Sequence, residues 1–531
     1  MSTFSRSAAF ATRSGRRNFL RSAGLFAIAS AVPHFSSSAK AAPGPLTSTD
    51  KTEELIYMSA TKLAQLIREK KVSAVEATMA YIDRQLAVND QLNAVVMNCY
   101  SRALKEAQAA DTALAQGKSL GPLHGVPMTI KDSLDTEGVI TTGATYGRQQ
   151  YVPTKDATCV ARVRAAGAIL LGKTNTPEFT LGGLGGISAA SNLLYGSSHN
   201  PYDLTRTTSG SSGGAGAIVA AGGAAFDIGS DWGGSIRGPA HNNGIAGIKP
   251  TSVRVPRTGH IVDYGGVFDL WQQLGPMTRR VEDIALITPL ISGPDYKDAS
   301  CAPGPWADPA KVDLKKLRLA YFPTNGVTTT DDDTKKTVLQ SVEWLEGLVA
   351  SVTEDLPKDI LTDLYAARTK LTGGDAWAFY KRLADKWGTK NFSPSVTERM
   401  KTMKPISSAE YVEAWEDADT AKSRMRGFPH RRSARPAGSA STPRQSVLCR
   451  RLPLQPRACP GWPLAAPAVR CRARWCRPWP PSRRPSRQPD KMPRRPLPRS
   501  APDARTHTGP DRPARDRRPD RPACRSCWKR A

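Results

Sequence analysis

The stretch Gly210-Ser211-Ser212-Gly213-Gly214 decides the fold of this chain, together with the later stretch Gly233-Gly234-Ser235-Ile236-Arg237. Each stretch places a serine in a glycine-rich turn, where the backbone can approach another segment closely. Upstream of both, Lys131 ends the short apolar run at residues 126–130. Two serines and a lysine supply a nucleophile, a proton relay and a base. This set needs no metal and no cofactor, and it predicts hydrolysis.

Each of these motifs is weak when taken alone. A glycine pair can simply allow a helix to pack closely on a strand, and most lysines lie at the surface. A nucleotide-binding loop is not indicated, because no Gly-Lys-Ser/Thr sequence follows the glycines. Lys131, however, ends an apolar strand, where burial would lower the pKa of its ammonium group. In that position the lysine could act as a base.

The body of the chain alternates short apolar runs with amphipathic stretches. Residues 55–114 have helical spacing throughout. Strands are expected at residues 126–130, 168–171, 224–228 and 317–322, and helices at residues 160–166, 215–221, 334–349 and 408–426. Strands that alternate with helices predict an α/β fold, in which a mostly parallel mixed sheet is covered by helices on both faces.

Five glycine-rich or polar segments occur in a fixed order, at residues 125–132, 172–179, 210–214, 231–237 and 247–251. In these segments the chain resembles the amidase signature family, and the resemblance extends over about residues 55–425. It implies one catalytic domain at residues 55–427 with its core at residues 120–255. One local departure is Ser209-Gly210, where the family often has two glycines.

The resemblance implies roles for individual residues. Ser235 lies in the family's nucleophile position, Ser211 in that of a bridging serine on a cis peptide bond, and Lys131 in that of the base. An oxyanion hole is implied for the backbone N–H groups of Trp232, Gly233, Gly234 and Ser235. We expect Asp231 and Arg237 to brace this loop, and Ser212 to support the site by hydrogen bonding within its own turn.

The implied triad is chemically coherent. A serine hydroxyl is a poor nucleophile until a neighbouring group accepts its proton. A neutral lysine in a desolvated pocket can do so through an intervening hydroxyl, which then returns the proton to the departing amine. We therefore expect a small-molecule or peptide amide as substrate, no cofactor, no nucleic acid and no stable membrane anchor. The sequence leaves the substrate's identity and the oligomeric state open.

Composition changes abruptly near Gly427. Residues 431–531 hold 27 of the 75 Lys and Arg residues but only 5 of the 47 Asp and Glu residues, which leaves the body nearly balanced in charge. They also hold 20 of the 42 prolines and no Ile, Phe, Tyr, Glu or Asn. Proline removes backbone donors, and so few apolar side chains cannot offset chain entropy. We expect disorder over residues 428–531.

Three interpretations of this tail remain open. It is an Arg-rich arm that binds RNA or membranes, a linker without function, or the product of a shifted reading frame in GC-rich DNA. The abrupt change in composition favours the third. Members of the amidase signature family normally continue with further strands and helices beyond this point. A frame shift would therefore remove part of the sheet's cover and one flank of the substrate pocket.

The first 41 residues are typical of an export signal. A twin-arginine pair, Arg16-Arg17, precedes an apolar run at residues 23–32 and the small residues around Ala39 and Ala41. A run of about ten apolar residues is too short to span a membrane, which takes about twenty. We expect a twin-arginine signal peptide and a periplasmic or secreted protein.

The sequence therefore predicts an exported amidase that forms an acyl-enzyme intermediate. Two rivals remain. One is the glutamine-hydrolysing subunit of a tRNA-dependent amidotransferase, against which the export signal weighs. The other is an inactive, truncated amidase-like protein with a basic tail that binds nucleic acid.

Overall fold

The computed structural model describes residues 54–184, 189–262, 264, 271–375 and 377–433 of the 531-residue chain. The chain divides into two units, Met1–Ala440 and Ser441–Ala531, and all described residues lie in the first. The predicted signal at residues 1–41 and nearly all of the predicted tail fall outside the described residues. Within those ranges, no helix combines the length and the apolar character that a membrane crossing requires.

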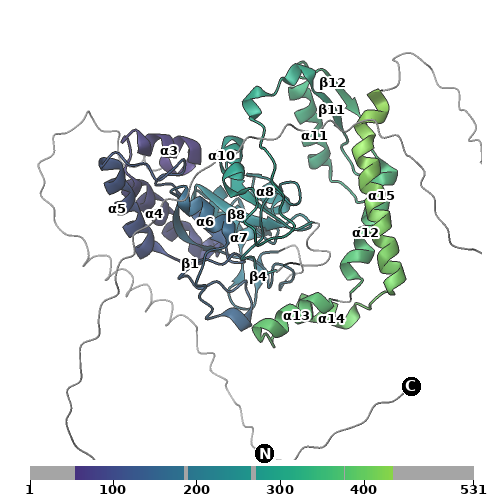
Figure 1. Cartoon of the computed structure of the whole chain (residues 1–531), viewed down its shortest axis with the longest axis horizontal. Coiled ribbons are helices and arrows are strands. Elements are labelled where there is room, and N and C mark those ends of the chain that lie inside the picture. Colours follow the sequence, from purple (N-terminus) through teal and green to yellow (C-terminus); the bar gives the residue numbers. More distant parts are fainter. Residues whose placement is uncertain (1–53, 185–188, 263, 265–270, 376, 434–531) are drawn as a thin grey trace, which may run out of the picture. The chain divides into compact units, whose positions relative to one another are not determined.

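A six-stranded mixed sheet forms the centre of the described unit (Figure 1). Its strands lie in the order β1-β3-β2-β8-β10-β9. Their bounds are Val95–Asn98 (β1), Pro127–Lys131 (β2), Ile169–Thr174 (β3), Phe226–Asp231 (β8), Ala246–Gly247 (β9) and Gln273–Thr278 (β10). β2 pairs in parallel with β3 and with β8, whereas β1 and β10 run antiparallel to their neighbours. The expectation of a mostly parallel mixed sheet is thereby confirmed.

Helices cover both faces of this sheet. In β10, Leu274 and Met277 point to opposite faces because side chains alternate along a strand. Leu274 belongs to a large apolar cluster that also takes in residues of α3 (Ala60–Arg68), α4 (Ala74–Leu92), α5 (Tyr100–Ala115), α6 (Thr158–Ala165) and α10 (Val281–Ile291). Met277 instead packs with Ala215 of α7 (Gly213–Ala220) and with Ile236. We call this second side the α7 face.

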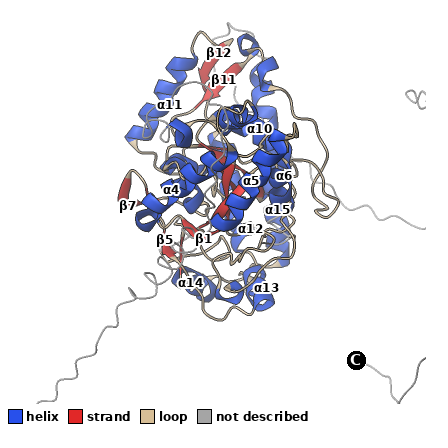
Figure 2. Ribbon diagram, turned by 90° about the vertical axis from the view of Figure 1, so that its left-hand side faces the viewer, coloured by secondary structure: helices blue, strands red, loops and turns tan. Residues whose placement is uncertain are grey.

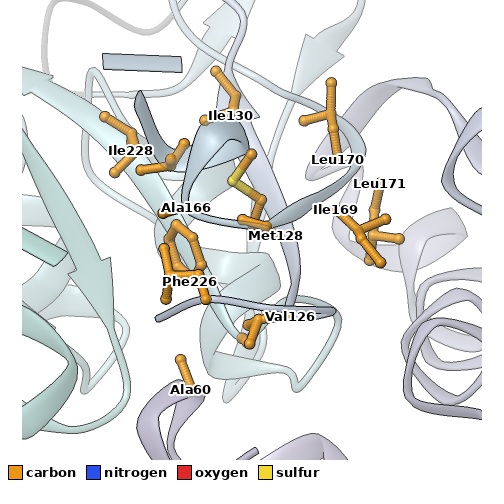
Figure 3. Close-up of a cluster of buried hydrophobic side chains, with 14 of the residues drawn as sticks. Ala60, Val126, Met128, Ile130, Ala166, Ile169, Leu170, Leu171, Phe226 and Ile228 are labelled. Carbon is orange, nitrogen blue, oxygen red and sulfur yellow. The ribbon is translucent and has the colours of Figure 1, made fainter. Parts of the chain in front are cut away.

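The large cluster is the main hydrophobic core. Figure 3 shows Met128 and Ile130 of β2, Phe226 and Ile228 of β8, and the β3 residues Ile169 to Leu171 gathered in it. Burying each such side chain contributes about 1.5–3 kcal/mol to stability. Continuous apolar runs of this kind are expected of central parallel strands, which helices cover on both sides.

The remaining elements follow the central sheet or lie in its loops. Three two-stranded sheets are formed by β4 (Ser191–Asn192) with β5 (Gly196–Ser197), β6 (His199–Asn200) with β7 (Asp203–Thr207), and β11 (Arg318–Tyr321) with β12 (Ser351–Glu354). The other helices are α8 (Arg237–Asn242), α11 (Asp332–Leu345), α12 (Lys358–Gly373), α13 (Ala378–Trp387), α14 (Pro394–Thr402) and α15 (Ser408–Ser433). Short 3₁₀ turns occur at Tyr146–Arg148, Pro309–Lys311 and Leu314–Lys316. α12 and α15 lie side by side (Figure 1), and Ala367 and Ala414 are among their shared contacts.

The expected elements are found, with three differences. Strand β1 interrupts the helical spacing of residues 55–114, because Asn93 adopts a left-handed conformation that ends α4. α11 ends at Leu345 rather than at residue 349. α15 continues through Ser433 rather than ending at residue 426, so it includes residues 428–433 of the segment for which disorder is expected. Figure 2 shows how helices enclose the strands in a second view.

Candidate active site

Alternation along β2 brings Lys131 to the α7 face. Met128 and Ile130 point into the main core, so Thr129 and Lys131 point the other way. Gly229 of β8 faces the same side, since a Cβ atom there would lie 2.8 Å from the Ser212 Oγ atom. The absence of a side chain at Gly229 therefore lets the serine-bearing turn approach the sheet next to Lys131.

The Lys131 ammonium group lies within a cluster of serine oxygens. Its Nζ atom donates to Ser211 Oγ at 2.6 Å, to Ser212 Oγ at 3.0 Å and to Ser230 Oγ at 2.9 Å. The Lys131 side chain is fully buried, and so are these serines to within 1% exposure. The predicted contact between the lysine and Ser211 is present.

Burial determines the protonation of Lys131. Desolvation lowers the pKa of its ammonium group to about 7, and the negative charges of Asp231 and Asp227 only partly oppose this shift. A large share of the lysine is therefore neutral near neutral pH. A neutral amine with a hydroxyl at 2.6 Å is a competent proton acceptor.

The two serine-bearing turns are joined to each other. The Ser212 N–H group donates to the Ser235 carbonyl oxygen at 3.1 Å, and the Gly210–Ser211 peptide bond is cis, as the sequence resemblance implies. Ser211 and Ser235 line the same cavity. Ser211 is buried, whereas Ser235 is half-buried and thus accessible from that cavity. The order from inside to outside is Lys131, Ser211, Ser235.

Asp231 holds the turn that carries Ser235. Its carboxylate accepts hydrogen bonds from the backbone N–H groups of Gly234 (2.8 Å) and Ile236 (3.0 Å), and from two nitrogens of the Arg237 guanidinium (both 3.0 Å). Burial tends to raise the pKa of this carboxyl, but the Arg237 guanidinium and the backbone donors lower it overall. The bracing role expected of Asp231 and Arg237 agrees with these bonds.

The expected oxyanion hole needs one correction. The Gly234 N–H group is occupied by Asp231, so it does not point at a substrate oxygen. The N–H groups of Gly233 and Ser235 have no hydrogen-bond acceptor among the described residues, and both residues line the cavity. Trp232 also lines it. The turn therefore offers fewer donors than its four consecutive N–H groups suggest, because one of them stabilises the turn itself.

Ser212 and Ser230 are linked by hydrogen bonds between β8 and the serine turn. The prediction that the Ser212 hydroxyl hydrogen-bonds within its own turn is wrong. The hydroxyl instead accepts from the Ser230 N–H group and donates to the Ser230 carbonyl oxygen, both at 3.3 Å. Ser230 is not among the site residues expected from the sequence, although it stands directly before Asp231 at the end of a strand parallel to that of Lys131. Its place at the end of that strand is the feature of the sequence from which Ser230 could be predicted as a site residue.

The cavity beside the serines has a volume of about 310 Å³. One side consists of the serine turns with Trp232 and Gln272. The other side comes from the segment between β3 and β4, with Thr180 and Leu181, and from α12, α13, α14 and the loops next to them, with Arg368, Thr372, Asp375, Trp377, Phe379, Tyr380 and Arg399. No residue of this second side is predicted from the sequence, because no local motif indicates it.

Comparisons with known proteins agree with this fold. A sequence model of the family described as Amidase matches residues 76–428, and the chain belongs to that family. The A subunit of glutamyl-tRNA(Gln) amidotransferase from Moorella thermoacetica is 45% identical over 269 residues, which are 50% of this chain and 53% of that relative. The indoleacetamide hydrolase of Bradyrhizobium diazoefficiens is 42% identical over 267 residues, or 50% of each chain.

A solved structure shares the fold. Fatty acid amide hydrolase superposes with a TM-score of 0.64 at 25% identity, over 72% of this chain and 68% of that chain. The present chain spans about half the length of the two curated relatives named above.

Proposed function

We propose that the protein hydrolyses a carboxamide C–N bond through an acyl-enzyme intermediate on Ser235. The observation that carries this proposal is the fully buried Lys131 amine, 2.6 Å from the hydroxyl of Ser211, beside a cavity that Ser211 and Ser235 share. Membership of the amidase family supports it.

The reaction follows from the order of the three side chains. Neutral Lys131 accepts a proton from Ser211, which takes one from Ser235 as the Ser235 oxygen attacks the amide carbon. The N–H groups of Gly233 and Ser235 stabilise the oxyanion, a contribution of about 3 kcal/mol for one such donor. Ser211 then protonates the departing nitrogen, the C–N bond breaks, and water releases the acid from Ser235 by the same relay.

The far side of the cavity supports a substrate that carries negative charge. The Arg368 guanidinium lies over the Trp232 ring at 5.4 Å, and the Arg399 guanidinium over the Trp377 ring at 5.1 Å. Neither forms an ion pair within the described part of the chain. The Asp375 carboxylate is engaged by the backbone N–H groups of Trp377 and Phe379. We therefore propose an amide with an apolar body and a carboxylate at the end away from the scissile bond.

The test uses the full chain and its Ser235→Ala variant. Both are assayed for acid release from succinamate and glutaramate, which are monoamides with a free carboxylate, and from uncharged hexanamide. Thermal unfolding shows whether the two proteins are equally folded. Hydrolysis by the parent that is lost in Ser235→Ala supports the proposal, whereas full activity in a folded Ser235→Ala protein contradicts it.

The second candidate is the catalytic subunit of an amidotransferase. Its support is the 45% identity to the Moorella thermoacetica subunit. Such a protein would act with partner subunits, whereas an independent amidase acts alone. Glutamine hydrolysis that appears only after other proteins of such a complex are added would favour this second candidate.

We also propose that the protein is exported through the twin-arginine pathway. The pair Arg16-Arg17 and the apolar run that follows support this. Fractionation of a host that expresses the full chain should find a shortened protein in the periplasm or medium. Replacing both arginines by lysine should retain it in the cytoplasm, and unchanged distribution would contradict the proposal.

A further inference from the structure

A second buried acid lies beside the site and is unused by the reaction described above. Asp227 is the second residue of β8 and has no exposed surface. Its neighbours Phe226 and Ile228 point into the main core, so Asp227 points to the α7 face. It is paired in register with Thr129 of β2, which precedes Lys131 by two residues on the same face. Asp227 therefore lies beside Thr129, and Thr129 is the next residue to Lys131 on that face of β2.

The contacts of Asp227 are neutral hydroxyl groups. Thr129 Oγ1 donates to its Oδ2 atom at 2.7 Å, and Thr174 Oγ1 donates to the same atom at 3.0 Å. The Oδ1 atom has no hydrogen-bond partner within the described residues. A carboxylate placed in the interior of a sheet costs several kcal/mol unless it is paired. Two threonines on two different strands hold this one, which indicates a built arrangement rather than a surface acid.

Few charges face Lys131 and Asp227. From β8, Asp231 and Asp227 both act on Lys131, and the Asp231 charge is already paired with Arg237. From β3, the buried Lys173 acts on Asp227. The turn before α7 contributes the hydroxyls of Ser211 and Ser212 but no charge. Burial and Lys131 lower the pKa of His260 to about 3, so its ring is neutral. Of the two acids that act on Lys131, Asp227 is thus the one that has no cation in hydrogen-bond contact among the described residues.

The protonation of Asp227 is sensitive to its two donors. Burial raises the pKa of its carboxyl to about 7, while the hydroxyls of Thr129 and Thr174 and the charge of Lys131 lower it. Removing either hydroxyl would favour the neutral acid. The threonines therefore control whether a negative charge is present beside the lysine.

We propose that Asp227, held by Thr129 and Thr174, is a positioning residue that sets how readily the Lys131 base gives up its proton. This inference rests on the proposed function of Lys131. A negative charge at Asp227 stabilises the ammonium form of Lys131, which is the inactive form of a base. Loss of that charge favours the neutral amine. The acid limb of the activity profile, which reports protonation of the free enzyme's base, then moves to lower pH.

The experiment measures the rate of phosphonylation of Ser235 by a fluorophosphonate between pH 5 and pH 9, in the full-length protein. In that reaction the Ser235 oxygen bonds to phosphorus, fluoride leaves, and the proton goes to Lys131 through Ser211. The variants are Asp227→Asn and Thr129→Val, with Thr129→Ser as the conservative replacement. Peptide mass mapping confirms the labelled serine, and thermal unfolding confirms the fold.

We expect the midpoint of the acid limb to fall by about one pH unit in Asp227→Asn, as for loss of a nearby opposite charge. Thr129→Val should shift it in the same direction by less, and Thr129→Ser should restore the parent value. Asp283→Asn is the control, because Asp283 is equally buried but binds the N-terminus of α3 through Ala60 and Thr61. It should lower stability without moving the midpoint.

The outcomes separate this inference from the proposed function. Labelling of Ser235 whose midpoint is the same in the parent, Asp227→Asn and Thr129→Val contradicts the role of Asp227 and leaves the hydrolase intact. Should Asp227→Asn fail to fold, Thr129→Val decides alone. A parent protein that is not labelled at any pH contradicts both the proposed function and the inference built on it.

Discussion

The two sides of the cavity are held in different ways. On the sheet side, Lys131, Ser211 and Ser230 are at most 1% exposed, and every one of them shares a hydrogen bond with another member of the cluster. On the helix side, Arg368 and Arg399 are half-buried, and the contacts that fix them are aromatic rings rather than hydrogen bonds. The sheet side presents fixed oxygens and one amine, while the helix side presents charge on long side chains.

This difference assigns the proton-transfer steps to the sheet side and the recognition of the substrate to the helix side. Groups that exchange a proton must keep a distance near 2.6–3.2 Å, which buried strands and glycine turns can enforce. Groups that recognise a substrate tolerate more freedom and are supplied by α12 to α14. Substitutions on the sheet side should therefore lower the rate with every amide, and substitutions on the helix side should change which amide is preferred.

The largest effect is expected for Lys131→Met. Loss of the base should lower kcat/KM by about 10³- to 10⁴-fold for charged and uncharged amides alike. The matched control is Lys173→Met, because Lys173 is equally buried on the neighbouring strand but binds Thr136, away from the serines. That control should lose stability and keep its activity within about tenfold. If the two variants are equally active when folded, Lys131 is not the base.

A somewhat smaller loss is expected for Ser211→Ala. Removal of the bridging hydroxyl separates the Lys131 amine from Ser235, and kcat should fall by about 10²- to 10³-fold with little change in KM. Steady-state kinetics on one neutral and one anionic amide provide the measurement. A rise in KM with unchanged kcat would instead make Ser211 a binding residue.

Gly229→Ala tests whether close packing sets the geometry. An added methyl group would lie 2.8 Å from Ser212 Oγ and 2.9 Å from Met277 Sδ, so these side chains, including the Ser212 hydroxyl that contacts Lys131, must shift. We expect kcat to fall by roughly 10- to 100-fold for all substrates. Gly347→Ala is the control for adding a methyl group at a glycine, since it has open space there, although its φ of +74° predicts a modest loss of stability. Unchanged kcat in a folded Gly229→Ala protein would show that the turn tolerates the shift.

The smallest and most selective effect is expected for Arg368→Gln. KM for glutaramate should rise about tenfold, whereas hexanamide hydrolysis should change less than about threefold, because only the anionic substrate loses a charged partner. Lys370→Gln, on the same helix but paired with Glu413 outside the cavity, should alter neither. Equal losses of activity with both substrates would show that Arg368 contributes to hydrolysis of every amide and does not select the anionic substrate.

The same division explains how much could be predicted from the sequence. Lys131, Ser211 and Ser235 lie in short segments where glycine spacing and strand period fix the local geometry, so a motif locates them. Arg368 and Arg399 come from α12 and α14, and Trp377 directly precedes α13. No motif in these segments indicates that they face the cavity. The use of the Gly234 N–H group by Asp231 depends on the folded turn. Ser230 becomes visible only when β2 and β8 are placed side by side.

The most direct test of the central claim is the pH dependence of Ser235 acylation in the parent protein, followed by stopped-flow mixing with an activated amide. Burial lowers the pKa of Lys131 to about 7, and the neutral amine is the active form. The rate should therefore be low at pH 5, rise with a midpoint near pH 7, and level off at higher pH, with the acyl group on Ser235. A midpoint near the pKa of an exposed lysine, or acylation of a different serine, would contradict the account.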